Sequence, residues 1–202
     1  MDGVLIDAKE WHYDSLNKAL SHFGFHISRD AHLSMFDGLP TFRKLDILTL
    51  SQGLPKGLHT HINELKQKYT IQYSYKYCKP TFNHRYALSK LSKKYKIAVC
   101  SNSIRNTVET MMDLSGLREY LNLIVSNQDV KCPKPDPEMF IKAINTFSLE
   151  PKECLILEDN DNGILAAKAS GAYLMKIATP DDVQLENIER KIRDINQSSN
   201  LN

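Results

Sequence analysis

One stretch, residues 155–163, constrains the fold of this chain more than any other. The apolar run Leu155-Ile156-Leu157 predicts a buried strand, which ends in the adjacent acids Glu158 and Asp159, and Gly163 then opens a helix. In open α/β sheets, ligands bind beyond the carboxyl ends of the strands. Neighbouring carboxylates there repel each other unless a cation or a proton lies between them. Oxygen ligands without nearby Cys or His suit Mg²⁺, and an acidic loop that caps the next helix is the alternative.

Composition places the chain among ordinary globular proteins. Its 202 residues suit one domain or a domain with an insert, and 42% hydrophobic with 25% charged residues is a usual soluble balance. The net charge of +2 is too small to indicate nucleic acid or a membrane surface as a partner, and no apolar run reaches the ~20 residues that span a bilayer. The four cysteines form no CxxC pair, so we expect no zinc site and a reducing, cytoplasmic location.

The order of predicted elements changes near Pro80. Apolar residues recur at helical spacing from Ala8 to Phe23, and residues 28–80 are predicted to be mostly helical, although 70–77 is ambiguous. After Pro80 the helices alternate with strands, which are expected at 97–100, 121–125, 154–157 and 172–177. Alternation of this kind predicts an α/β fold, a parallel sheet with helices on both faces. The helical block of residues 8–80 is then an insertion near the start.

Polar side chains follow three of the predicted strands. Ser101 and Asn102 come after strand 97–100, where a hydroxyl and the amides of a helix N-terminus can bind an anion. Lys134 follows strand 121–125 in a loop that prolines restrict, which suits a point charge aimed at phosphate. Each of these residues has a simpler explanation, helix capping or a solvated lysine. Together with the acid pair, in this order on successive strand ends, they indicate a phosphate site.

These motifs give the chain a resemblance to the haloacid dehalogenase (HAD) superfamily of phosphohydrolases, in the branch of phosphoglycolate phosphatase and β-phosphoglucomutase with a helical cap. The run 2–7 resembles the family's first motif, Ser101 its second, Lys134-Pro135-x-Pro137 its third, and Glu158-Asp159-x-x-x-Gly163 its fourth. The resemblance covers nearly the whole chain. It implies a Rossmann-like parallel sheet as the core, formed by residues 1–7 and 81–202, and a cap formed by residues 8–80.

The resemblance also implies a reaction, phosphoryl transfer through an aspartyl-phosphate. By position, Asp2 is implied to be the general acid and base, with its backbone carbonyl on the metal. Ser101 and Asn102 are implied to bind the phosphoryl oxygens, and Lys134 to pair with the nucleophile and the phosphate. The pair 158–159 is implied to hold Mg²⁺. The implied substrate is a small phosphorylated metabolite.

One departure from the family pattern concerns the nucleophile. The family's nucleophilic Asp stands two positions before the residue matched by Asp2, which is before Met1. We therefore expect that the given chain lacks its nucleophile and the central strand leading to it, through a start at an internal Met or through gene decay. The alternative is a stable, non-catalytic relative that binds a phosphorylated ligand through the remaining residues.

The predicted cap bears on specificity. His12 matches a histidine common at the hinge between cap and core, where it could orient the acid/base, and a surface histidine is the alternative. The run 36–41 resembles a substrate-specificity loop, and Thr41 stands where phosphomutases of this branch carry an Arg for a second phosphate. This difference favours a phosphatase over a mutase. We expect a monomer or a weak dimer.

Overall fold

The computed structural model describes residues 1–36 and 38–199. Asp37, within the predicted specificity loop, lies outside the described residues. The α-helices are α1 (Lys9–Ser21), α2 (Arg29–Ala31), α3 (Thr41–Gln52), α4 (His59–Tyr77), α5 (Phe82–Leu91), α6 (Arg105–Leu114), α7 (Glu138–Thr146), α8 (Asp161–Ala169) and α9 (Leu185–Ser199). Short π or 3₁₀ turns are η1 (His32–Phe36), η2 (Lys56–Leu58), η3 (Arg118–Tyr120), η4 (Asn127–Asp129), η5 (Pro151–Glu153) and η6 (Pro180–Asp182). In this part of the chain, no helix combines the length and the apolar character needed to cross a membrane.

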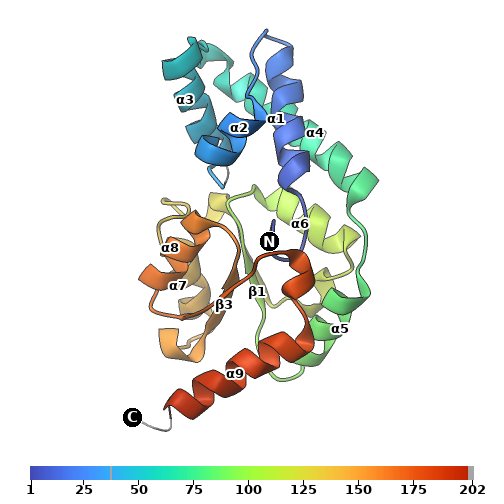
Figure 1. The fold of residues 1–202 in the computed structure, drawn as a ribbon, viewed down its shortest axis with the longest axis vertical. Coiled ribbons are helices and arrows are strands. Elements are labelled where there is room, and N and C mark those ends of the chain that lie inside the picture. Colours follow the sequence, from blue (N-terminus) through green and yellow to red (C-terminus); the bar gives the residue numbers. More distant parts are fainter. Residues whose placement is uncertain (37, 200–202) are drawn as a thin grey trace.

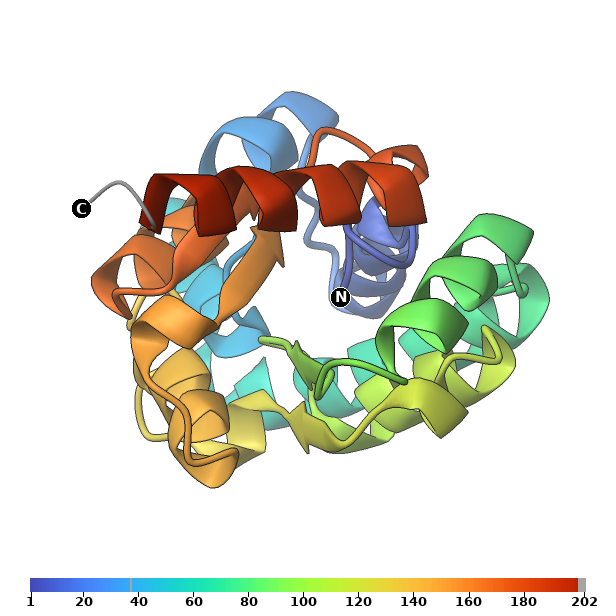
Figure 2. The ribbon, with the colours of Figure 1, turned by 90° about the horizontal axis from the view of Figure 1, so that it is seen from below.

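The strands form two parallel pairs, which confirms the predicted α/β fold. β1 (Ala98–Cys100) pairs with β2 (Leu123–Val125), and β3 (Leu155–Glu158) pairs with β4 (Tyr173–Lys176). Over residues 1–36 and 38–199, no strand pairing joins β1 to β3. Seen from below, the N-terminus lies between the two pairs (Figure 2). The strands and the helices α5 to α9 form the lower body in Figure 1.

The ambiguous segment 70–77 is the second half of the long helix α4. The buried positions Ile62, Lys66, Thr70 and Ser74 recur every four residues, which is one face of a helix. This face packs on α1, and together with α3 the two helices enclose a hydrophobic cluster whose members all lie between residues 16 and 69. The segment 8–80 therefore has a hydrophobic cluster of its own.

The start of α8 differs from the sequence prediction. Gly163 was expected to open this helix, but α8 begins at Asp161. The side chain of Asn160 accepts a hydrogen bond from the backbone N–H of Asn162 (2.9 Å), so Asn160 caps a helix that begins two residues before the predicted start. As a result, Gly163 lies inside the first turn.

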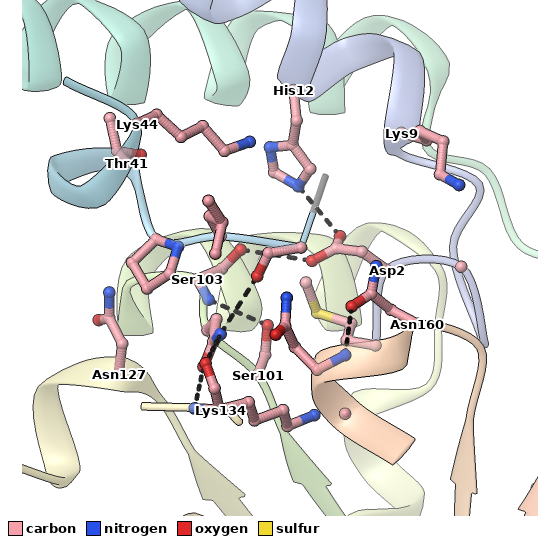
Figure 3. A pocket seen from close by; sticks show the side chains of 18 of the residues that line it. Asp2, Lys9, His12, Thr41, Lys44, Ser101, Ser103, Asn127, Lys134 and Asn160 are labelled. Atoms are coloured by element: carbon pink, nitrogen blue, oxygen red, sulfur yellow. Dashed lines mark hydrogen bonds and ion pairs between the residues drawn. The ribbon is translucent and has the colours of Figure 1, made fainter. Parts of the chain in front are cut away.

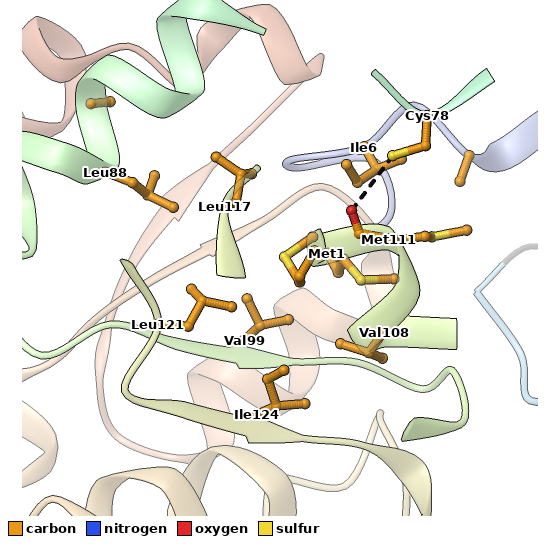
Figure 4. Packing of buried hydrophobic residues seen from close by; sticks show 13 residues of the cluster. Met1, Ile6, Cys78, Leu88, Val99, Val108, Met111, Leu117, Leu121 and Ile124 are labelled. Carbon is orange, nitrogen blue, oxygen red and sulfur yellow. Dashed lines mark hydrogen bonds between the residues drawn. The ribbon is translucent and has the colours of Figure 1, made fainter. Parts of the chain in front are cut away.

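The first residues of the chain are packed in the core. The backbone N–H of Leu5 donates to the carbonyl of Met1 (2.8 Å), so the segment turns back on itself at once. Met1 and Ile6 are buried in a cluster with Val99 of β1 and Met111 of α6 (Figure 4). Because this turn is anchored on both sides of Asp2, the position of that carboxylate is fixed by the core.

Candidate active site

A cavity of about 180 Å³ lies between the helices of segment 8–80 and the carboxyl ends of β1 and β3 (Figure 3). It brings together every site residue that the sequence predicted. Those residues are Asp2, His12, Thr41, Ser101, Asn102, Lys134, Glu158 and Asp159. They come from the N-terminal turn, α1, the start of α3, the ends of β1 and β3, and the loop before α7. Their roles remain predictions, but their meeting in one place is a property of the fold.

Asp2 faces His12 across the cavity. Its Oδ1 lies 3.2 Å from His12 Nε2, and its Oδ2 accepts a 3.3 Å hydrogen bond from the hydroxyl of Ser103. Burial raises the pKa of the Asp2 carboxyl, but the attraction of His12, the N-terminal ammonium and Lys66 outweighs it and holds this pKa well below its usual range. Asp2 is therefore a carboxylate in the protein as described.

Ser101 and Asn102 continue β1 into the cavity. The buried hydroxyl of Ser101 accepts a hydrogen bond from the backbone N–H of Ser103 (3.1 Å). The side chain of Asn102 donates to the carbonyl of Lys134 (3.1 Å) and accepts from its N–H (3.0 Å), so it clamps the loop before α7. It also donates to the carbonyl of Gly38 (3.4 Å), which links segment 8–80 to the sheet.

Lys134 and Glu158 form a buried ion pair. The Lys134 ammonium contacts Glu158 Oε1 and donates to the carbonyl of Cys100 (3.0 Å). The two residues are 7% and 5% exposed, so the pair is nearly out of water. The sequence prediction treated Glu158 and Asp159 as one metal-binding unit. In the structure the Glu158 carboxylate is turned to Lys134, while Asp159 lies against the N-terminal turn.

Asp159 is held close to the backbone of Gly3. A Cβ atom on Gly3 would lie 1.9 Å from Asp159 Oδ2, and Gly3 has φ = +70°, so position 3 requires glycine twice over. Burial raises the pKa of Asp159, and the charge of Glu158 adds to this, against a lowering by the N-terminal ammonium. A carboxylate in such surroundings is stabilised by a cation.

These residues fit Mg²⁺ better than a metal whose whole coordination shell consists of protein ligands. Among the described residues, no three His, Cys, Asp or Glu side chains converge on a common metal position. Mg²⁺ needs fewer, because it usually takes one or two carboxylates and completes its shell with water and phosphate oxygens. Asp159 and Asp2, which both line this cavity, offer hard oxygen atoms of that kind beside the residues predicted to bind phosphate.

Two of the polar cavity residues that sequence reasoning missed are buried where they face the cavity. Lys66 of α4 is buried, with Nζ 3.4 Å from His12 Nδ1, and burial together with Lys44 lowers its pKa to about 7. The signal was present, since a lysine stands within the four-residue repeat of the buried face of α4. The second is Asn127, whose buried Oδ1 borders the cavity without a hydrogen-bond partner among the described residues. Nothing local in the sequence indicated Asn127.

Comparison with known proteins gives the family. The profile of the haloacid dehalogenase-like hydrolases matches residues 1–177, which is most of the chain and includes every predicted site residue. The chain belongs to this family. The HAD resemblance drawn from the motifs is thereby confirmed.

Relatives of this HAD-family chain include proteins named as phosphatases. It is 26% identical over 172 residues to the fructose-1-phosphate phosphatase YqaB of Escherichia coli, covering 85% of this chain and 89% of that protein. It is 26% identical over 185 residues to the pyrophosphatase PpaX of Bacillus mycoides, covering 88% and 80%. These similarities support a hydrolase acting on phosphate bonds.

Solved structures confirm the fold of this HAD-family chain. The β-phosphoglucomutase of Clostridium difficile superimposes with a TM-score of 0.81 over 96% of this chain and 94% of its own, at 20% identity. CbbY of Rhodobacter sphaeroides, solved in complex with phosphate, gives a TM-score of 0.78 over 87% and 82%, at 18% identity. The Rossmann-like α/β architecture expected from the sequence is therefore established.

Proposed function

We propose that this HAD-family chain is a Mg²⁺-dependent phosphatase of small phosphorylated metabolites, with residues 8–80 as its cap. The observation that carries the proposal is the meeting of Asp2, Ser101, Lys134 and Asp159 in one cavity. An acid/base carboxylate, a hydroxyl, an ammonium and a metal-binding carboxylate are the groups that phosphoryl transfer needs, because its catalysis is mostly positioning and neutralisation of charge.

The phosphoryl group is proposed to lie at the end of β1. The Ser101 hydroxyl and the neighbouring backbone would hold its oxygens, and Lys134 would neutralise charge that develops during transfer. Since Asn102 fixes the Lys134 backbone through two hydrogen bonds, it acts in this scheme as a positioning residue. Mg²⁺ held by Asp159 and Asp2 would reduce the repulsion between the phosphate and the attacking carboxylate.

Asp2 is proposed to move the proton. The family resemblance implies a nucleophilic carboxylate two positions before the residue that Asp2 matches. Its attack on phosphorus breaks the bond to the leaving oxygen, which takes a proton from Asp2, and Asp2 then removes a proton from the water that hydrolyses the aspartyl-phosphate. The approach of an anionic phosphate raises the pKa of Asp2, which allows the proton to be carried.

The test compares two aspartates in a chain extended before Met1 by an apolar strand ending in Asp. We expect this chain with Mg²⁺ to release phosphate from a panel of sugar phosphates, and Asp2→Asn to lower kcat by at least about 10²-fold. Asp7→Asn is the matched control, because Asp7 is exposed and does not line the cavity. Equal turnover of Asp2→Asn and Asp7→Asn would contradict the role of Asp2.

Two alternatives to the phosphatase, a non-catalytic phosphate-binding protein and a phosphomutase, predict different results in these assays. A non-catalytic phosphate-binding protein would be stabilised against heat by Mg²⁺ with inorganic phosphate and would show no turnover even when extended. A phosphomutase would convert a hexose 1-phosphate to the 6-phosphate without releasing phosphate. Thr41 lies at the cavity where phosphomutases of this branch carry an Arg, and its lack of charge favours the phosphatase, although Lys44 also lines the cavity and offers a cation to a substrate anion. The cytoplasmic location and the monomeric or weakly dimeric state stay predictions.

A further inference from the structure

Charge is unevenly distributed along the chain. Between Glu64 and Glu109 the sequence holds ten Lys and Arg residues and no Asp or Glu. The chain as a whole has a net charge of only +2, so the remaining residues are net acidic. The small net charge therefore does not describe the local surface, because an anionic partner is attracted by the charge that is near it.

Exposed aromatic side chains gather in the same region. Among residues 1–36 and 38–199, five of the six exposed Phe, Tyr and Trp side chains lie between residues 75 and 95. Phe82 is the most exposed of them, at 79%. Single exposed apolar side chains are ordinary on a protein surface, whereas a group of them marks an interaction surface.

The rings form stacks on two helices. Phe82 and Tyr86 lie one turn apart on α5, with ring centroids 5.7 Å apart and ring planes at 12°. Near the end of α4, Tyr73 and Tyr77 stack in the same way, with centroids 6.0 Å apart and planes at 13°. Such stacks offer flat ring faces to a partner, onto which another planar group can be added.

Lysines lie beside these rings. The Nζ of Lys90 is 5.3 Å from the centroid of the Tyr86 ring, and the Nζ of Lys76 is 4.8 Å from that of the Tyr77 ring. Figures 1 and 2 show α4 and α5 along the same flank of the molecule, on the right in both views. We call the exposed side chains of residues 75–90 the α4–α5 surface. It combines aromatic rings with positive charge and contains no Asp or Glu of its own.

This chemistry favours a single-stranded nucleic acid over a lipid surface. Proteins that bind single strands stack the bases on aromatic rings and contact the phosphates with cations. Helices that lie on a membrane insert an apolar face rich in Leu, Trp or Phe. Three of the four exposed aromatic residues of the α4–α5 surface are tyrosines, which carry a polar hydroxyl, and no Leu, Ile or Trp is exposed there.

We propose that the α4–α5 surface binds single-stranded nucleic acid. Bases stack on the rings of Phe82 and Tyr86, and phosphates contact Lys76, Lys79 and Lys90. The positive charge is available for this, since the pair of Arg85 with Glu119 is long (3.9 Å) and exposed and neutralises little of it. None of these residues lines the candidate active site, so the proposal does not depend on the proposed function.

Fluorescence anisotropy of the full chain with a labelled oligoadenylate of about 12 nucleotides tests the proposal. We expect Phe82→Ala with Tyr86→Ala to weaken binding at least about fivefold, and to leave its dependence on salt unchanged, because stacking carries no charge. Lys76→Ala with Lys79→Ala should instead reduce the slope of log K against log salt by about 1.4, since each phosphate contact to a single strand contributes about 0.7.

Two further variants separate stacking from general effects. Phe82→Leu with Tyr86→Leu keeps apolar side chains on α5 and removes the flat rings, so it should weaken binding as the alanine pair does. The matched control is Leu165→Ala with Lys168→Ala, which removes an exposed apolar residue and an exposed lysine from α8, on the opposite side in Figure 1. The control should bind as the parent does.

Three results would overturn the proposal. The first is no binding of oligoadenylate by the parent at about 50 mM salt, where phosphate contacts are strong. The second is an equal loss of binding in the α5 variants and in the α8 control. The third is a different partner, shown by binding to phosphatidylserine vesicles without binding to oligoadenylate, or by a dimer in sedimentation that Phe82→Ala with Tyr86→Ala dissociates.

Discussion

Among single residues, the buried pair of Lys134 and Glu158 has the largest expected effect on stability. Lys134→Met leaves the Glu158 carboxylate buried without its counter-ion, which typically costs about 3–5 kcal/mol. Urea unfolding should show this loss. It should also show a smaller loss for Lys134→Met combined with Glu158→Gln, where no charge remains. The exposed Lys168→Met is the control and should change stability by less than about 0.5 kcal/mol.

Lys66 should make stability depend on pH. Its pKa falls from 10.5 in water to about 7 in the folded protein, so between these values the unfolded chain binds more protons. Stability should therefore rise with pH from about 7 to 10.5, by up to about 1.4 kcal/mol per pH unit from this group. Below that window the charged ammonium is destabilising in the fold and no further change is expected from it.

Urea unfolding at pH 7, 8 and 9 checks this dependence. Lys66→Met should be more stable than the parent at pH 7, and the difference should shrink as the pH rises. Lys68→Met, one position beyond Gln67 on the exposed side of α4, should keep the slope of the parent. If the free energy of unfolding changed with pH in the same way in Lys66→Met and Lys68→Met, the pKa of Lys66 would not be lowered in the folded protein.

At the scale of elements, the packing of α8 on the end of β3 depends on position 163 being glycine, which has no side chain. A Cβ on Gly163 would lie 2.3 Å from Glu158 Cδ, and that carboxylate cannot withdraw freely because it is paired with Lys134. Gly163→Ala should lower stability by about 1–3 kcal/mol through overpacking, although alanine favours helix by about 1 kcal/mol.

Gly57 provides the control for Gly163→Ala. A Cβ added to Gly57 in η2 would meet no described atom within 4 Å, and Gly57 has no positive φ. Gly57→Ala should therefore be neutral or stabilising by up to about 1 kcal/mol. Thermal unfolding of the two variants side by side measures the difference. A loss at Gly57 equal to that at Gly163 would mean that crowding against Glu158 is not the cause.

For the whole molecule, an apolar cavity of about 430 Å³ that β1 and β3 line should govern the response to pressure. Pressure favours unfolding in proportion to the internal void that unfolding eliminates. Fluorescence of Trp11, the single tryptophan, reports unfolding because its ring is partly buried against the core and stacks on Tyr77. Ala143→Leu, at a buried residue that lines this cavity, should raise the midpoint pressure above that of the unchanged protein, because the larger side chain fills part of the void. Equal midpoints would mean that the larger side chain leaves the void open.

Much of the site could be predicted because its signals are local. Ser101, Lys134 and Asp159 each follow an apolar run, and the carboxyl ends of parallel strands meet at one edge of a sheet. The start of α8 was less predictable, since Asn160 and Gly163 both carry helix-start signals and only the side-chain hydrogen bond of Asn160 selects one. Asn127 carried no signal, because its burial depends on residues distant in the chain.

The sequence by itself determined the alternation of helices and strands and the residue types at the strand ends, because apolar periodicity and strand-end chemistry depend on neighbours along the chain. Only the tertiary structure decided that Glu158 turns to Lys134, that Lys66 reaches His12, and that a cavity lies between β1 and β3. These features depend on which elements pack together. Packing is set by the shape and burial of the whole molecule, which no local pattern contains.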